Sequence, residues 1–368
     1  DTSIAIDPTF VRAWLTHLLQ QFGSGAQGGA RYISLDNEPM LWHHTHRDVH
    51  PAPVGYDELL ARTIDYAAAV KTTDPTAFTT GPALWGWSAY FYSALDQADG
   101  GNWWKKAPDR QAHDGLPLVA WYLQQLAAYE ARTGMRLLDY LDLHFYPQTP
   151  DVALAGVGDQ EIQTRRLRST RALWDPDYTD ESWIAEPIQL IPRMRAWVDE
   201  YYPGTKLALT EYNWGALDHL NGALAQADIL GIFGREGLDM AMLWAPLDAQ
   251  QPFAYAFRLY RNYDGRGSTF GNTSVRAVSS DQELLSIYAA QRTQDGALTL
   301  MVINKSKDTL ISALTMEHFA AADRAQLYRY DISNLHTIQQ LPDRPISSVG
   351  FNTAFPGHSI TLIVIPPM

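Results

Sequence analysis

Two short motifs place a glutamate directly after an apolar run. Asn37-Glu38-Pro39 follows residues 31–35, and Thr210-Glu211-Tyr212 ends a run that starts at Lys206. Hydrolysis of a glycosidic bond requires two carboxyl groups that face the same bond. One protonates the leaving oxygen, and the other attacks the sugar or activates water. Each motif is weak alone, but the two together favour this chemistry.

The elements that must position these glutamates alternate between strands and helices. Alternation of this kind predicts a parallel sheet with helices outside. Polar and aromatic residues follow most of the strands, which favours a (β/α) barrel over an open sheet. The expected strands span 31–35, 77–81, 138–145, 206–210 and 240–244, and the expected helices 8–22, 56–71, 116–133, 188–201 and 221–236.

A closed barrel of this kind has eight strands, and the pattern supplies five. Either the fold is not a closed barrel, or residues 1–250 are the C-terminal portion of a barrel whose first three strands are missing from this chain. The chain starts at Asp1 without a signal-peptide pattern, which we interpret as a processed or shortened chain. The missing part of the barrel is then the expected polypeptide partner.

The pattern changes after residue 250. Strands are expected at 283–292, 297–304, 325–331 and 359–365, with a hairpin at Asp295-Gly296. We interpret residues 251–368 as a small β-sandwich.

Composition excludes several classes of protein. The 368 residues carry 28 basic and 41 acidic side chains, a formal net charge of −13, which argues against nucleic acid and anionic membranes as partners. A hydrophobic content of 46% excludes a disordered chain. No apolar run is long enough for a membrane helix. The 12 Trp and 19 Tyr residues suit a sugar-binding cleft, which needs flat aromatic faces.

The motifs resemble glycoside hydrolase family 44 of the retaining (β/α)8 glycosidases. The resemblance is carried by the runs 32–39 (YISLDNEP), 41–51 (LWHHTHRDVHP), 85–90 (WGWSAY) and 210–215 (TEYNWG). It implies a TIM-like barrel, of which the five strands are the fourth to the eighth, plus a C-terminal β-sandwich. It also implies endo-acting cleavage of β-1,4-glucan backbones, including xyloglucan and, in some members, xylan.

By the same resemblance, Glu38 is the general acid/base and Glu211 the nucleophile of a double displacement. The two carboxyl groups should then lie about 5–5.5 Å apart. The resemblance and the strand-end positions together give these expected substrate-binding residues: Asn37, Trp42, His44, Trp85, Trp87, His144, Tyr146, Tyr212, Trp214 and Trp244. The tryptophans at positions 42, 85, 87, 103 and 104 are candidates for sugar-binding subsites, and about half of them should instead be core residues.

Two clusters raise the question of a metal. The histidines at positions 43, 44, 46 and 50 lack the spacing of a helical or hairpin metal clamp, and the chemistry requires no metal or other cofactor. Asp96, Asp99 and Asp114 crowd a glycine-rich loop, where oxygen ligands would suit a structural calcium; an ordinary solvated loop is the alternative.

We therefore predict a secreted retaining endo-β-1,4-glucanase with a β-glucan polysaccharide as its partner. Two alternatives stay open. One is a related enzyme of the same clan specific for xylan or mannan. The other is a carbohydrate-binding barrel without catalysis, although the presence of both glutamates argues against it.

Overall fold

The computed structural model describes residues 3–98, 100–246 and 248–368. These residues form two compact units, each built from several chain segments. The first unit comprises residues 1–146, 191–212 and 238–244, and the second comprises residues 147–190, 213–237 and 245–368.

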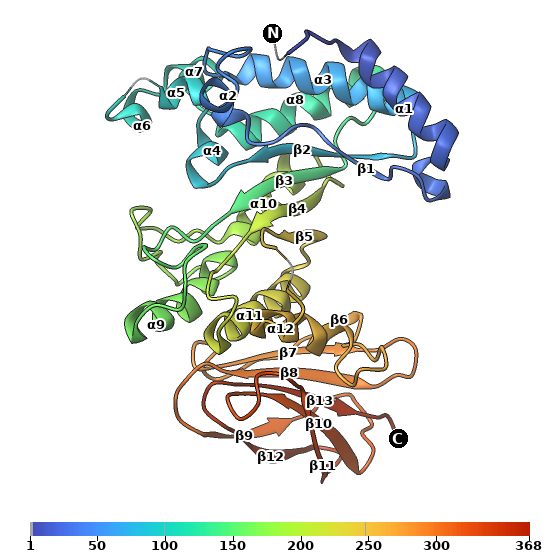
Figure 1. Cartoon of the computed structure of the whole chain (residues 1–368), viewed down its shortest axis with the longest axis vertical. Helices are drawn as coiled ribbons and strands as arrows, with labels where there is room; N and C mark the ends of the chain where they lie inside the picture. The colour runs from blue at the N-terminus through green and yellow to red at the C-terminus, as the bar shows by residue number, and fades with distance from the viewer. Residues whose placement is uncertain (1–2, 99, 247) are drawn as a thin grey trace. The chain divides into compact units, whose positions relative to one another are not determined.

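The centre of the first unit is a parallel sheet of five strands in the order β1-β2-β3-β4-β5. The sheet is a curled half-barrel (Figure 1). Its strands are β1 (Tyr32–Ser34), β2 (Phe78–Leu84), β3 (Tyr140–Phe145), β4 (Lys206–Tyr212) and β5 (Met240–Leu243). Every residue of β3 is buried, as expected where both faces of a parallel sheet are covered.

Four long helices alternate with these strands. They are α1 (Pro8–Phe22), α3 (Tyr56–Thr73), α8 (Leu118–Thr133) and α10 (Leu190–Tyr201). Asp7 caps α1 by accepting the Thr9 N–H, and Pro8 occupies its first turn. Figure 1 shows α1, α3 and α8 together on one side of β1 and β2. Short elements fill the connections: η1 (Gly25–Gln27), η2 (Pro39–Leu41), α2 (Trp42–Thr45), α4 (Trp87–Phe91), α5 (Ala94–Gln97), α6 (Trp103–Lys106) and α7 (Pro108–Ala112).

The second unit combines helices with an antiparallel sandwich. A six-stranded sheet has the order β11-β10-β13-β8-β7-β6, and a two-stranded sheet pairs β12 with β9. Leu314 of β9 and Phe355 of β12 share one core with Leu300 and Ile363 of the larger sheet, so the two sheets pack face to face. The strands are β6 (Thr273–Val275), β7 (Leu285–Gln291), β8 (Leu298–Asn304), β9 (Leu310–Thr315), β10 (Arg324–Tyr330), β11 (Gln339–Pro345), β12 (Gly350–Phe355) and β13 (Ser359–Ile365).

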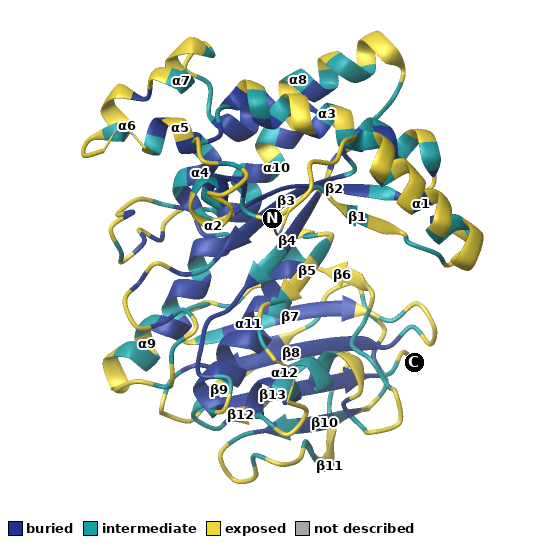
Figure 2. Ribbon diagram, turned by 45° about the horizontal axis from the view of Figure 1, so that its top comes forward, coloured by how far each residue is buried: buried dark blue, intermediate teal, exposed yellow. Residues whose placement is uncertain are grey.

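The helices of this unit are α9 (Gln160–Ser169), η3 (Thr170–Leu173), α11 (Leu220–Glu236) and α12 (Pro252–Arg261). α11 packs against α12 and against strands β7 and β8. Burial is deepest along α11 and the central strands of the sandwich (Figure 2).

The expected mixed α/β fold with a parallel sheet and a β domain is confirmed. All nine expected strands exist, and the expected hairpin joins β7 to β8. The sequence reasoning missed β6, β9, β11, β12 and the helices α9 and α12. The domain boundary near residue 250 stays a prediction. Among the described residues, no helix combines the length and apolarity needed to cross a membrane.

Candidate active site

Glu38 lies in a tight turn after β1. The turn places Asp36 and Glu38 at φ of 69° and 45°, in the left-handed region that side chains other than glycine rarely adopt. Two hydrogen bonds hold the turn: the Asp36 carboxylate accepts the Asn37 N–H at 2.7 Å, and the Glu38 N–H donates to the Ala83 carbonyl at 3.0 Å. The buried Pro39 then begins η2. The left-handed backbone of Glu38 is thus fixed by its neighbours, as is common at functional sites.

His144 and Glu211 lie side by side on neighbouring strands, β3 and β4. The register between these strands shifts by one residue, so Leu143 pairs with Leu209 but His144 pairs with Glu211. Thr210 is therefore the extra residue of a bulge. A bulge interrupts the alternation of side chains along a strand. Thr210 and Glu211 can therefore both reach the face of β3 that carries Asp142 and His144. Thr210 bonds Asp142 at 2.6 Å, while Glu211 approaches His144.

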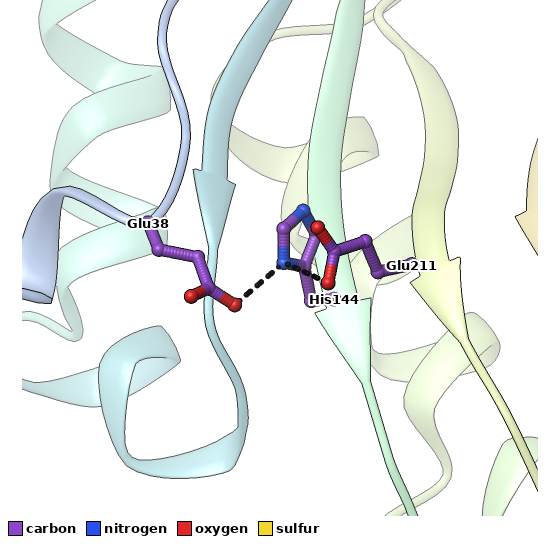
Figure 3. Close-up of side chains that lie close together, drawn as sticks. All are labelled: Glu38, His144 and Glu211. Atoms are coloured by element: carbon purple, nitrogen blue, oxygen red, sulfur yellow. Dashed lines mark hydrogen bonds and ion pairs between the residues drawn. The ribbon is translucent and has the colours of Figure 1, made fainter. Parts of the chain in front are cut away.

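The imidazole of His144 stands between the two glutamates (Figure 3). Its Nδ1 lies 2.9 Å from Glu38 Oε1 and 3.4 Å from Glu211 Oε2. The facing atoms of the three residues all lie within 4.8 Å of one another. Nδ1 must carry a proton to bond an ionised carboxylate, so His144 acts as a shared donor. One oxygen of Glu38 thus lies within 4.8 Å of one oxygen of Glu211, which is compatible with the carboxyl groups of retaining glycosidases, about 5–5.5 Å apart.

A second donor orients Glu211. The Tyr146 hydroxyl donates to Glu211 Oε2 at 2.8 Å. Burial raises the pKa of Tyr146, and the nearby Glu211 carboxylate raises it further, so the phenol remains a proton donor.

Two further buried residues lie near His144. The Tyr90 hydroxyl donates a hydrogen bond to the His144 carbonyl. Asp142, two residues before His144 on β3, is fully buried and has one oxygen without a hydrogen-bond partner. Burial raises the pKa of Asp142. Sequence reasoning missed both residues. The only signal for Asp142 was a carboxylate inside an apolar strand, two positions before a candidate site residue.

Four of the expected substrate-binding residues are exposed. Asn37 and His44 lie in the segment around η2, Trp85 follows β2 with 39% of its surface exposed, and Trp244 follows β5 with 56% exposed. These side chains can meet a ligand.

Four other expected residues are packed instead. Trp42 lies edge-on to His50 with its ring centroid 5.3 Å away, and Trp87 packs on Phe91 at 4.8 Å. Tyr212 is buried in β4. Trp214 belongs to the second unit, where its indole N–H donates to Ser169. A stacking residue needs an exposed ring face, so these side chains fit packing roles.

Asp96, the buried residue of the expected calcium site, is occupied by other partners. Asp96 is buried, and its two oxygens accept the backbone N–H groups of Asp109 and Arg110 at 2.8 and 3.2 Å. Asp114 is exposed, and Asp99 lies outside the described residues. Within the described part of the chain, the one cluster of three or more acidic or histidine side chains close enough to share an ion is Glu38, His144 and Glu211. A hydrogen bond already joins His144 to Glu38 and an ion-pair contact joins His144 to Glu211, and we do not assign the three as ligands.

A cavity of about 620 Å³ lies within the second unit, beside α11, α12, β6 and β7. Arg235, Tyr260 and Tyr288 are among its lining residues. None of Glu38, His144 and Glu211 lines it.

A parallel (β/α) sheet with two glutamates at its strand ends is the arrangement of a barrel-type glycosidase. Comparison with known proteins agrees. The family model described as glycoside hydrolase family 44 matches residues 1–149. A solved structure of CelM2, a bifunctional glucanase-xylanase from a metagenome library, is 46% identical, and the match covers 99% of this chain and 70% of CelM2 with a TM-score of 0.95.

Two further relatives are similar over most of the chain. A Paenibacillus polymyxa xyloglucanase from family 44 is 34% identical, with a TM-score of 0.88 over 96% of this chain and 70% of that structure. Endoglucanase A of Paenibacillus lautus is 39% identical over 306 residues, which are 80% of this chain and 42% of the relative. The chain belongs to glycoside hydrolase family 44. It spans less than half the length of this curated relative.

Proposed function

We propose that this chain carries the catalytic pair of a retaining, endo-acting glycoside hydrolase that cleaves β-1,4-glucan backbones. The observation that supports this most directly is the arrangement of Glu38 and Glu211, whose carboxyl oxygens share the His144 donor within 4.8 Å.

In the first step, Glu211 attacks the anomeric carbon while protonated Glu38 donates its proton to the leaving oxygen. The sugar becomes bonded to Glu211, and the leaving chain departs as an alcohol. In the second step, Glu38 removes a proton from water, which displaces Glu211 and restores both groups. The His144 N–H and the Tyr146 hydroxyl hold the carboxyl groups in the geometry that both steps need.

The five strands of the half-barrel correspond, in this proposal, to the fourth to eighth strands of a (β/α)8 barrel. Residues 1–250 are the C-terminal portion of that barrel, and the remaining three strands come from polypeptide outside this chain. Supporting this, the sheet is wholly parallel and its strand order follows the chain.

The substrate is a soluble or branched β-1,4-glucan such as xyloglucan or carboxymethylcellulose, with xylan as a further substrate. The names of the relatives support this range, since one is a glucanase-xylanase and another a xyloglucanase. Asn37, His44, Trp85 and Trp244 are the exposed residues that would contact the sugar chain. Because a polysaccharide cannot enter a cell intact, the enzyme would act as a secreted protein.

The test is release of reducing ends from xyloglucan and carboxymethylcellulose by the protein that carries this chain. Glu211→Gln should abolish release and preserve polysaccharide binding. A proton NMR time course should show that the first product keeps the β configuration. A product that first appears as the α anomer contradicts the retaining mechanism.

The same experiment separates the alternatives. A non-catalytic binding protein would release no reducing ends, and Glu211→Gln would change little. An enzyme specific for xylan or mannan would release sugar from those polymers and not from xyloglucan.

A further inference from the structure

The connection from β2 to α8 carries aromatic side chains that the proposed catalytic step does not use. We call residues 85–117 the β2–α8 connection; within it, residue 99 lies outside the described part. It contains the short helices α4, α5, α6 and α7. It leaves β2 at the carboxyl end of the strand, the edge of the sheet at which the site residues lie.

The base of this connection is firmly attached beside Glu38. α5 packs against η2, the turn that directly follows Glu38. The Leu95 N–H bonds the Val54 carbonyl at 3.1 Å, and Asp109 accepts the Tyr56 N–H at 3.0 Å. Asp96 ties α5 to α7 through two backbone N–H groups. A surface on this connection is therefore fixed relative to the acid/base residue.

A row of aromatic rings runs through the connection to the surface. Phe91 contacts Tyr92 with ring centroids 6.4 Å apart, Tyr92 contacts Trp103 at 5.0 Å, and Trp103 contacts Trp104 at 5.4 Å. The outermost ring, Trp104, is 50% exposed. Arg110 lies over Tyr92 at 5.0 Å. Figure 2 shows α6, which carries both tryptophans, as mainly exposed.

We propose that the exposed ring of Trp104 is a docking surface for a β-glucan chain, which extends the substrate surface outward from the Glu38 side of the site. This rests on the proposed function. Trp103 and Tyr92 hold this ring in place by the edge-to-face contacts above. A neutral glucan is the occupant that fits best, because a flat apolar sugar face can stack on the exposed indole of Trp104. The exposed Asn102 and Lys105 offer hydrogen-bond donors to hydroxyl groups. Rings that are already packed lose little freedom when a chain binds.

The test compares a long polymer with a short oligosaccharide. The value of kcat/KM is measured for xyloglucan and for cellotetraose, and the ratio of the two is followed in Trp104→Ala. An aromatic contact of ordinary strength predicts that this ratio falls about three- to tenfold. Trp104→Phe, which keeps a ring, should recover most of the loss. Trp14→Ala is the matched control, since Trp14 on α1 is equally exposed at 51% and should leave the ratio unchanged.

The outcomes are distinct. An unchanged ratio in Trp104→Ala overturns the docking surface. If the ratio is unchanged because kcat/KM falls equally for the polymer and the tetraose, the substitution acts through the fold. Binding of xyloglucan to the inactive Glu211→Gln protein, with and without Trp104→Ala, gives a second readout. If the unsubstituted protein cleaves neither substrate, the proposed function itself fails, and that failure is recognised without any Trp104 variant.

Discussion

Replacing His144 by phenylalanine tests the role of the shared donor. The substitution keeps an aromatic ring in a fully enclosed position and removes Nδ1. Glu38 then loses a hydrogen bond of 2.9 Å, and Glu211 loses a contact of 3.4 Å. A hydrogen bond to a charged group contributes about 1.5–3 kcal/mol. Since about 1.4 kcal/mol corresponds to a factor of ten in rate, kcat/KM should fall about 10- to 150-fold.

The assay is kcat/KM on a soluble oligosaccharide, with the free energy of unfolding measured by urea on the same preparation. His144→Asn, which retains an N–H donor, should lose less activity than His144→Phe. Wild-type kinetics in His144→Phe would refute the reasoning, because the two carboxyl groups would then be held without the bridge. A loss as large as that of Glu211→Gln would also refute it, since His144 would then take part in the chemistry and not merely position it.

Other substitutions and a chelator test the surroundings of the site and the buried charges. Tyr146→Phe removes a 2.8 Å bond to Glu211 and should lower kcat/KM about tenfold or more. Because burial and Glu211 raise the pKa of Tyr146, this loss should be the same throughout the pH range of the assay. Burial raises the pKa of Asp142, so this residue stabilises the fold most below the ordinary Asp pKa, and less as pH rises through its pKa in the folded protein. In urea unfolding, Asp142→Asn should therefore be at least as stable as wild type at neutral pH. This advantage should be lost at low pH. Burial opposes ionisation of Asp228, but Lys305 at 3.1 Å and neighbouring hydroxyls lower the pKa of Asp228 overall. Ionised Asp228 therefore stabilises the fold, and this stabilisation is lost as pH falls through the lowered pKa. Asp228→Asn leaves the buried Lys305 ammonium unpaired and should cost about 3–5 kcal/mol by urea unfolding, whereas Asp228→Leu with Lys305→Met should recover much of it. Treatment with EDTA should leave kcat/KM unchanged, and a loss restored by calcium would contradict a metal-free site.

The strands and the two glutamates could be predicted because their signals are local. Each strand is a short apolar run, and each long helix shows apolar periodicity. Asp7 with Pro8 fixes the start of α1 at the predicted residue. The glutamates follow strands, and parallel strands bring their carboxyl ends to one edge of a sheet. Sequence order alone therefore placed Glu38, His144 and Glu211 at the same edge.

The roles of the aromatic residues could not be predicted in the same way. Trp85 and Trp87 are two residues apart, yet Trp85 is exposed and Trp87 lies in the core. The difference arises because α4 begins at Trp87 and turns its ring toward Phe91 and Arg193. The contact with Arg193 joins segments that are distant in the chain, and residue spacing cannot predict it. Asp96 looked like a calcium ligand for the same reason, since its partners are backbone N–H groups of a later turn.

The register of β4 against β3 explains why the site also needed the structure. In a regular strand, Thr210 and Glu211 would point to opposite faces, because side chains alternate. If Thr210 bonded Asp142, Glu211 would then face away from His144. The one-residue shift after Leu209 removes this conflict: Thr210 anchors the buried Asp142, and Glu211 pairs with His144. A one-residue shift in register moves each side chain to the other face of a sheet. The bulge, and not the motif Thr210-Glu211-Tyr212 itself, therefore directs Glu211 toward His144 and Glu38.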